Sequence, residues 1–408
     1  MVSRTEQTPV HATSFQADVL DTGAIHDELN RLWSELGGPP LGGEGSGEMV
    51  AETNSGGGGL MRANTLNLLA VARNERDAGL ITASISRLQD FLPSRTIILI
   101  TRPVDRRDSD NASLYDVHLQ LNEQHIGTEA PPLRFESITI TAGINKMGQL
   151  ASLVSPLLAA ELTDFLWWPG NDFVNNPLFE DLQQIVDRVI VDSAQLGNDA
   201  SGVAAMRALL DEDDESSPRI GDFAWLRLAP WRQLIAQFFD PPDVQLCLST
   251  IEEVTISYAD VREDGSSGFA SALLTVGWLA SRLGWDIMDS LEKRRAGGWS
   301  APLRAAATNG RSREINLRLL PDKSPFARFS LRHVEITAGG AHSGTFRVER
   351  TDADDMVTSS ETPTVPFVSR MVYAKRPSNE KMLGEELQRF GRDRTFEEAI
   401  TFATRLLL

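Results

Sequence analysis

Cysteine is almost missing from this 408-residue sequence, since Cys247 stands alone. A single cysteine excludes an intrachain disulfide and any zinc or iron–sulfur centre built on cysteine ligands. It is also typical of proteins kept in a reducing compartment. The neighbours Val-Gln-Leu-Cys-Leu are mostly apolar, which predicts a buried, unreactive thiol at Cys247.

Long hydrophobic runs and positive charge are scarce as well. No apolar run approaches the roughly 18 residues that a membrane-spanning helix needs, and the first residues open no hydrophobic leader. The 39 Lys and Arg face 57 Asp and Glu, giving a net charge of −18. Such a field repels nucleic acids and anionic lipids. We therefore expect a cytoplasmic protein that binds neither nucleic acid nor membrane.

The sequence also lacks the common catalytic motifs. It contains no dinucleotide fingerprint, no P-loop, no Gly-x-Ser-x-Gly and no His-Glu-x-x-His. Its six histidines show no metal-ligand spacing. These absences predict a non-enzymatic protein with no catalytic residue, no cofactor and no metal.

The first 59 residues predict a segment outside the fold. Residues 22–36 place Ile25, Leu29 and Leu32 at helical spacing, which predicts a short amphipathic helix. Residues 37–59 then hold ten glycines, a composition typical of a flexible linker. We expect residues 1–59 to be loosely tethered and dispensable for folding.

Residues 60–215 predict an α/β domain, because apolar strands alternate with helices. A regular alternation indicates a parallel or mixed sheet with helices on both faces. The expected strands are 65–72, 96–101, 163–168 and 188–191, with half-exposed strands at 117–121 and 138–140. The expected helices are 75–91, 147–160, 177–186 and 200–210.

The rest of the chain predicts two further parts. Residues 216–248 form a tryptophan-rich connecting segment, with a helix that starts at Pro230 and stops at Pro241. Residues 249–408 predict an α+β domain with a largely antiparallel sheet, a helix over 269–283 and a terminal helix begun by a Thr395–Glu398 capping box.

Three places are candidates for a binding site. Asp192 and Ser193 end a strand, where α/β proteins often bind ligands, although either residue could instead cap the next turn. Trp167 and Trp168 are adjacent on a strand, so one is expected in the core and the other on a partly exposed surface. Trp225, Arg227, Trp231 and Arg232 have the composition of an interface hot spot; the alternative is buried tryptophan with solvated or acid-paired arginine.

Several segments together resemble one family, the glucose-6-phosphate dehydrogenase assembly proteins known as OpcA. The segments occur in the family's order and cover roughly residues 61–240: Met61–Leu68, Arg95–Leu99, Asp164–Gly170, Asp187–Ser193, Gly221–Leu228 and Pro230–Arg232. The C-terminal third agrees only in its general pattern.

The resemblance implies a non-catalytic assembly factor and allosteric activator of glucose-6-phosphate dehydrogenase, in the oxidative pentose phosphate pathway. It would raise the enzyme's apparent affinity for glucose 6-phosphate, with the three candidate places as partner-binding residues. The family is also described as redox-controlled through thioredoxin, and with one cysteine any such switch must be intermolecular. Two alternatives stay open: a purely structural assembly factor, and a sugar- or nucleotide-binding transferase-like enzyme with its site near Asp192.

Overall fold

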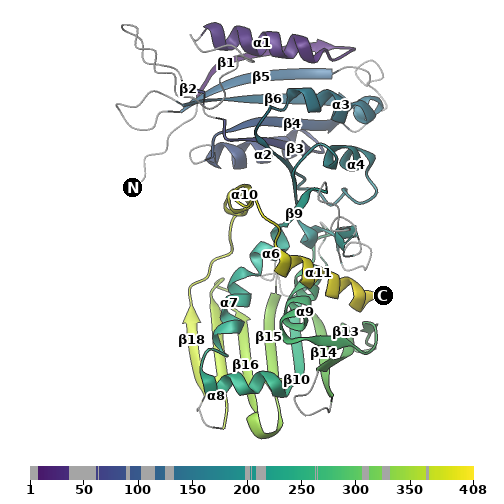
Figure 1. Cartoon of the computed structure of the whole chain (residues 1–408), viewed down its shortest axis with the longest axis vertical. Coiled ribbons are helices and arrows are strands. Elements are labelled where there is room, and N and C mark those ends of the chain that lie inside the picture. The colour runs from purple at the N-terminus through teal and green to yellow at the C-terminus, as the bar shows by residue number, and fades with distance from the viewer. Residues whose placement is uncertain are drawn as a thin grey trace. The chain divides into compact units, whose positions relative to one another are not determined.

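The computed structural model (Figure 1) divides into two compact units. The first comprises Met1–Ile190, Ser216–Arg219 and Leu383–Arg389, and the second Val191–Glu215, Ile220–Met382 and Phe390–Leu408. The structure describes residues 8–35, 61–62, 64–88, 92–102, 115–124, 133–197, 203, 205–207, 217–261, 263, 265–305, 312–323, 331–363 and 367–408. Among these, no helix combines the length and the apolar character that crossing a bilayer requires.

The first unit is built on a mixed sheet. Its strands lie in the order β1 (Thr8–Ala17), β5 (Tyr115–Gln124), β6 (Leu133–Gly143), β4 (Ser94–Arg102), β3 (Leu66–Ala72), β7 (Thr163–Trp167) and β8 (Arg188–Val191). The run from β6 to β8 is parallel, while β1 and β5 are antiparallel to their neighbours. The short strand β2 (Met61–Arg62) pairs with β6. Arg219, the first residue of β9 (Arg219–Asp222) and its one residue in this unit, donates its N–H to the Asp187 carbonyl. The predicted α/β class is confirmed.

The order of the strands decides where the helices lie. The chain moves from β3 through α2 (Glu75–Leu88) to β4 on one side. It later moves from β6 through α3 (Leu150–Val154) to β7, and through α4 (Pro177–Gln183) to β8, in the opposite direction. Because such crossovers are right-handed, α2 covers one face of the sheet and α3 and α4 the other. The direction of winding therefore switches between β3 and β7.

The N-terminal segment corrects one prediction. The helix is confirmed as α1 (Thr22–Glu35), but it is not loosely tethered, because Ile25, Leu29 and Trp33 have no exposed surface. The unexpected strand β1 also pairs with β5 along its length. Residues 8–35 are thus part of the fold, since they cover the edge of β5 and bury an apolar helix face. The glycine-rich stretch lies outside the described residues.

A buried ion pair joins two distant parts of the sequence within the first unit. Arg188 of β8 donates through Nε and Nη2 to Oε2 of Glu386, over 3.0 and 2.6 Å. Glu386 lies on α10 (Asn379–Leu387), and the two side chains are 3% and 1% exposed. A guanidinium enclosed in a sheet needs such a partner, because an uncompensated buried charge costs several kcal/mol.

The second unit contains a largely antiparallel sheet, as predicted. Its order is β11 (Trp285–Ile287), β13 (Trp299–Ala305), β14 (Arg313–Asp322), β10 (Ile251–Ala259), β15 (Leu331–Ala338), β16 (Gly344–Arg350), β17 (Met356–Glu361) and β18 (Val368–Val372), with β12 (Glu292–Lys293) beside β13. Only β10 and β14 are parallel among these pairs.

Helices cover one face of this second sheet. Phe238, next to α7 (Ala229–Gln237), packs on Phe346, and Phe269 of α9 (Phe269–Leu283) packs on Tyr258. The strand register places Phe346 and Tyr258 on the same face. The opposite face carries the ion pairs Arg318–Glu253 and Arg347–Glu335, as expected for an antiparallel sheet with one face toward water. Among the described residues, this unit also contains the α-helices α6 (Phe223–Arg227), α8 (Pro242–Gln245) and α11 (Arg394–Leu407), and residues 203 and 205–207 are helical as well.

The terminal helix α11 crosses α9 at very short range. A Cβ atom placed on Gly277 of α9 would lie 2.0 Å from the carbonyl oxygen of Ala399. The predicted Thr395–Glu398 capping box is wrong, because Asp393 is the cap and its carboxylate accepts from the Phe396 N–H over 3.0 Å. Asp393 precedes the helix, so its carboxylate can accept from the free N–H groups of the first turn. Thr395 already lies inside the helix and cannot act as the cap. The predicted domain boundaries at residues 59, 215 and 248 stay predictions.

Candidate functional site

Asp192 and Arg227 form a bidentate ion pair in the second unit. Asp192 follows β8 directly and is 4% exposed. Both of its carboxylate oxygens accept from Arg227, through Nη1 and Nη2, each over 2.7 Å. Oδ1 also accepts from the N–H of Ala194 over 3.3 Å and so caps the short turn Ser193–Gln195. The capping alternative for Asp192 is confirmed, and its carboxylate is occupied by the chain's own groups.

A second carboxylate, Asp222, lies beside this pair. It accepts the Ser193 N–H over 2.9 Å, the Ser193 hydroxyl over 2.7 Å and the Ala224 N–H over 3.0 Å. Burial, followed by repulsion from Asp192, raises the pKa of Asp222 to about 6. The Ser193 hydroxyl donates to a carboxylate that is itself buried, so this contact ties the turn after β8 to the start of α6. The geometry favours a structural cluster.

Trp225 and Arg232 form a stacked pair on α6 and α7. The Arg232 guanidinium lies 3.5 Å from the centroid of the Trp225 ring, and its Nη1 donates to the Trp225 carbonyl over 2.9 Å. On its other edge, the Trp225 indole N–H donates to Asp393, the cap of α11, over 2.9 Å. Trp225 is 2% exposed and Arg232 is half-buried. The pair joins three helices of the second unit.

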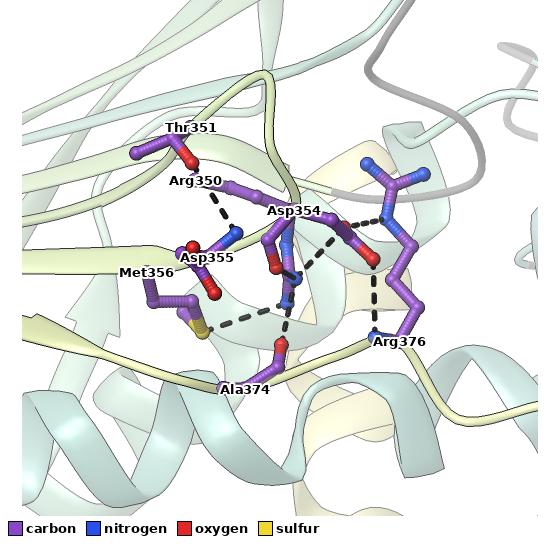
Figure 2. A network of polar contacts seen from close by, with 7 residues as sticks. All are labelled: Arg350, Thr351, Asp354, Asp355, Met356, Ala374 and Arg376. Atoms are coloured by element: carbon purple, nitrogen blue, oxygen red, sulfur yellow. Dashed lines mark hydrogen bonds and ion pairs between the residues drawn. The ribbon is translucent and has the colours of Figure 1, made fainter.

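Trp231 lies in the core, next to a buried arginine. The Arg350 guanidinium is 5.8 Å from the Trp231 ring centroid, within cation–π range. Figure 2 shows the polar side of Arg350, whose Nη1 donates to Oδ1 of Asp354 over 3.0 Å and to the Ala374 carbonyl over 2.9 Å. Trp231 therefore supports a polar network that holds the residues after β18.

The two adjacent tryptophans of the first unit correct another prediction, since both are buried at 2% exposure. Strand β7 ends at Trp167, so the alternation rule does not apply to Trp168. The Trp168 indole N–H donates to Asp172 over 2.9 Å, and its ring meets Phe179 edge-on at 5.2 Å. They lie where the winding direction switches between β3 and β7, the place where doubly wound proteins often bind ligands. Here aromatic side chains pack at that position.

The structure thus brings some of the predicted residues together and separates others. Asp192, Ser193 and Arg227 share one cluster, and Trp225 pairs with Arg232. The role of all eight residues in partner binding stays a prediction. Only Arg227 and Arg232 of this set keep more than a trace of exposed surface.

One feature that sequence reasoning missed is a cavity of about 750 Å³ in the second unit. Charged residues of α11 and of the segment before it line one part of the wall. Arg392 and Glu397 form an ion pair within the lining, and the lining residue Glu398 pairs with Arg282. Much of its charge is therefore neutralised internally. The described lining residues are Arg207, Ala280, Ser281, Gly284, Trp285, Asp286, Arg392, Arg394, Glu397, Glu398, Thr401, Phe402 and Arg405.

The sequence prediction of a buried thiol at Cys247 can be compared directly with the structure. Cys247 is 3% exposed and burial raises the pKa of its thiol, which confirms a buried cysteine. Within the described part of the chain, no group of three His, Cys, Asp or Glu residues is arranged to hold a metal ion.

The fold and the clusters together define a two-unit α/β protein. Most contacts of its arginine and tryptophan clusters are made within the chain and hold its own helices and turns in place. Two family models match it in sequence order: the N-terminal domain of the glucose-6-phosphate dehydrogenase subunit over residues 86–208, and the C-terminal domain over residues 218–400. The chain belongs to this family, known as OpcA.

Curated proteins similar to this chain carry the same family name. A putative OxPP cycle protein OpcA of Nostoc punctiforme is 28% identical over 269 residues, which are 65% of this chain and 56% of the relative. The OpcA protein of Synechococcus elongatus is 27% identical over 280 residues, 65% of this chain and 58% of the relative. The aligned part thus spans little more than half the length of these relatives. Among solved structures, a biliverdin reductase from Synechocystis covers 84% of this chain and 98% of its own, at 10% identity and a TM-score of 0.42, which does not establish a shared fold.

Proposed function

We propose that this chain is a cytoplasmic, non-catalytic subunit that binds glucose-6-phosphate dehydrogenase in the oxidative pentose phosphate pathway and raises its apparent affinity for glucose 6-phosphate. The observation that carries the proposal is the match to both domains of the dehydrogenase subunit family, in order. The site geometry supports it, because Asp192, the residue near which the enzyme alternative places its site, and the adjacent Asp222 are buried and hydrogen-bonded within the chain.

The physical basis of activation is a shift of population in the partner. A subunit that binds the substrate-competent state of the enzyme more tightly by about 2–3 kcal/mol changes the apparent substrate affinity by roughly 30- to 150-fold. We do not expect control through thioredoxin, because the chain's one thiol is buried.

The test uses the dehydrogenase encoded in the same genome, with and without the purified chain. We expect the chain to bind at micromolar concentration or below and to lower the Michaelis constant for glucose 6-phosphate, while showing no turnover alone. A changed oligomer yield with unchanged kinetics would indicate a purely structural assembly factor. Absence of both binding and kinetic effect would reject the association.

The two predicted docking arginines, Arg227 and Arg232, call for different variants in this assay. Arg227→Ala would leave the Asp192 carboxylate without its bidentate donor and cost about 3–5 kcal/mol of folding stability. Arg232 is half-buried and stacks on Trp225, so Arg232→Lys, which keeps the charge, should be compared with Arg232→Ala. If Arg232 contacts the dehydrogenase, a variant at this position should activate the enzyme less while its own melting temperature stays unchanged.

A further inference from the structure

The last strand of the second sheet, β18, is an edge strand, and apolar side chains in and next to it are exposed to solvent. Phe367, Met371 and Tyr373 are 61%, 72% and 73% exposed. Strand β17 pairs with one side of β18, and no strand of the described residues pairs with the other. Natural proteins usually cover or shorten such an edge, because its open backbone groups and apolar side chains form a template for another strand.

The apolar side chains share one face of the edge. Met371 lies opposite Val357 of β17, on the face of the sheet that carries no helices. Phe367 and Tyr373 are an even number of residues from Met371, so extended backbone places all three on this face. Arg370 opposes Thr358 on the other face and is exposed. Just beyond the strand, the Lys375 ammonium lies 5.3 Å from the Tyr373 ring centroid. The edge thus combines an apolar face with positive charge, on a chain whose net charge is −18.

A polar network around the buried Arg350 holds this exposed edge in place (Figure 2). Arg350 is 2% exposed and donates to the carbonyl of Ala374, which follows β18. Asp354 accepts the backbone N–H of Arg376 over 3.3 Å and pairs with its Nε over 2.9 Å. Asp354 itself has a left-handed backbone, with φ of 70°, in the turn between β16 and β17. A buried guanidinium and a strained turn are thus both used to position the end of a solvent-exposed strand.

We propose that β18 is a docking edge that accepts an extended strand of the partner dehydrogenase, with an acidic side chain opposite Arg370 and apolar side chains against Met371 and Tyr373. The proposal rests on the proposed function for the identity of the partner. Addition of a strand supplies affinity through backbone hydrogen bonds and specificity through alternate side chains. The anchored end lowers the ordering cost of binding.

Charge favours such a strand over a second copy of this chain. Arg370 is the central residue of Val368–Val372. In a two-fold antiparallel pairing of β18 with its copy, centred on the strand, each Arg370 would face the other Arg370. Like charges directly opposite destabilise a strand pair, whereas a carboxylate at that position stabilises it. Arg370 therefore acts against self-pairing and in favour of an acidic partner.

The test compares variants at the edge in binding to the dehydrogenase. Met371→Glu and Arg370→Glu should each weaken binding at least about ten-fold, and Arg370→Glu should also reduce its salt dependence. Leu80→Glu is the matched control, because Leu80 is 64% exposed on α2 of the first unit and should leave affinity unchanged. Melting temperatures of the variants alone check the fold. In the wild-type complex, the backbone amides of Val368–Val372 should exchange hydrogen more slowly than in the free chain.

The outcomes separate this proposal from the function on which it rests. If the wild type binds but both edge variants bind equally well and the β18 amides stay unprotected, the docking edge is rejected while the proposed function stands. If the wild type itself does not bind, both are rejected. If the wild type sediments as a dimer that Met371→Glu dissociates, the occupant is a second copy and the proposal is overturned.

Discussion

The indole Nε1 of Trp33 donates to Oε1 of Glu136 over 2.7 Å, and both side chains are fully enclosed. The other carboxylate oxygen of Glu136 accepts from Nε of Arg95 over 2.7 Å, and Arg95 in turn donates to the Leu157 carbonyl. Helix α1 therefore supplies a donor to a buried charge in the sheet of the first unit. The N-terminal helix is therefore an integral part of the first unit, held by the Trp33–Glu136 hydrogen bond as well as by its buried apolar face.

Trp33→Phe tests this role. The variant removes one donor from a buried carboxylate, which should cost about 1.5–3 kcal/mol of unfolding free energy. Urea denaturation followed by circular dichroism measures the loss. Ser34→Ala, an exposed position on the same helix, is the control and should change stability by less than about 0.5 kcal/mol. Equal stability of the two variants would contradict the role assigned to Trp33.

Asp222 predicts a pH dependence of stability. Its pKa is about 6 in the folded chain against an ordinary value of 3.8, so the folded state holds this proton more tightly than the unfolded state. The associated stability is complete below about pH 4 and is lost as the pH rises through 6, by about 3 kcal/mol at most. Asp222→Asn keeps an oxygen acceptor and removes the titration. The difference in unfolding free energy, wild type minus variant, should fall between pH 4 and 6 and then level off. Parallel profiles for the two proteins would refute the assignment.

Gly277→Ala should disrupt the crossing of α9 and α11. Because the new methyl would lie 2.0 Å from the Ala399 carbonyl oxygen, the helices must move apart, at a cost of about 1–3 kcal/mol or more. Gly79→Ala on α2 is the matched control, since nothing lies within 4 Å of its Cβ position; it should stabilise the chain by up to about 1 kcal/mol. Thermal melting of the two variants should therefore shift in opposite directions.

Cys247 should be inert in the native protein. The thiol is buried and burial raises its pKa, so little thiolate is present or accessible at neutral pH. A colourimetric thiol reagent should label the native chain no faster than it unfolds, and should label it at once in concentrated urea. Treatment with a disulfide reagent, which oxidises thiols but not methionines, should leave binding to the dehydrogenase unchanged. Rapid native labelling with loss of binding would revive direct redox control.

Elements that bury a complete side-chain pattern could be predicted from the sequence. Strand β3 is buried on both faces and reads as a continuous apolar run. Helix α9 has the predicted bounds, because its apolar sequence ends at Gly284, which adopts φ of 64° as a C-terminal cap. Strands β1, β17 and β18 were missed, since paired backbone rather than apolar periodicity identifies them.

The candidate site was predictable in composition but not in arrangement. The pattern of tryptophan and arginine is real, yet the sequence does not reveal which acid each one meets. Arg227 meets Asp192 from 35 residues away, and Trp225 meets Asp393 from 168 residues away. Because these partners are set by tertiary packing, local patterns favoured a surface where the structure has an interior.

The ion pair between Arg188 and Glu386 bears on how the chain folds as it leaves the ribosome. Domains generally fold in order from the N-terminus, at synthesis rates of about 5–20 residues per second. Glu386 follows Arg188 by 198 residues, which corresponds to roughly 10–40 s of translation. During that interval the carboxylate that accepts from Arg188 has not been made. The first unit therefore cannot complete its core as a nascent N-terminal domain, because the Arg188–Glu386 pair must wait until most of the second unit has been synthesised.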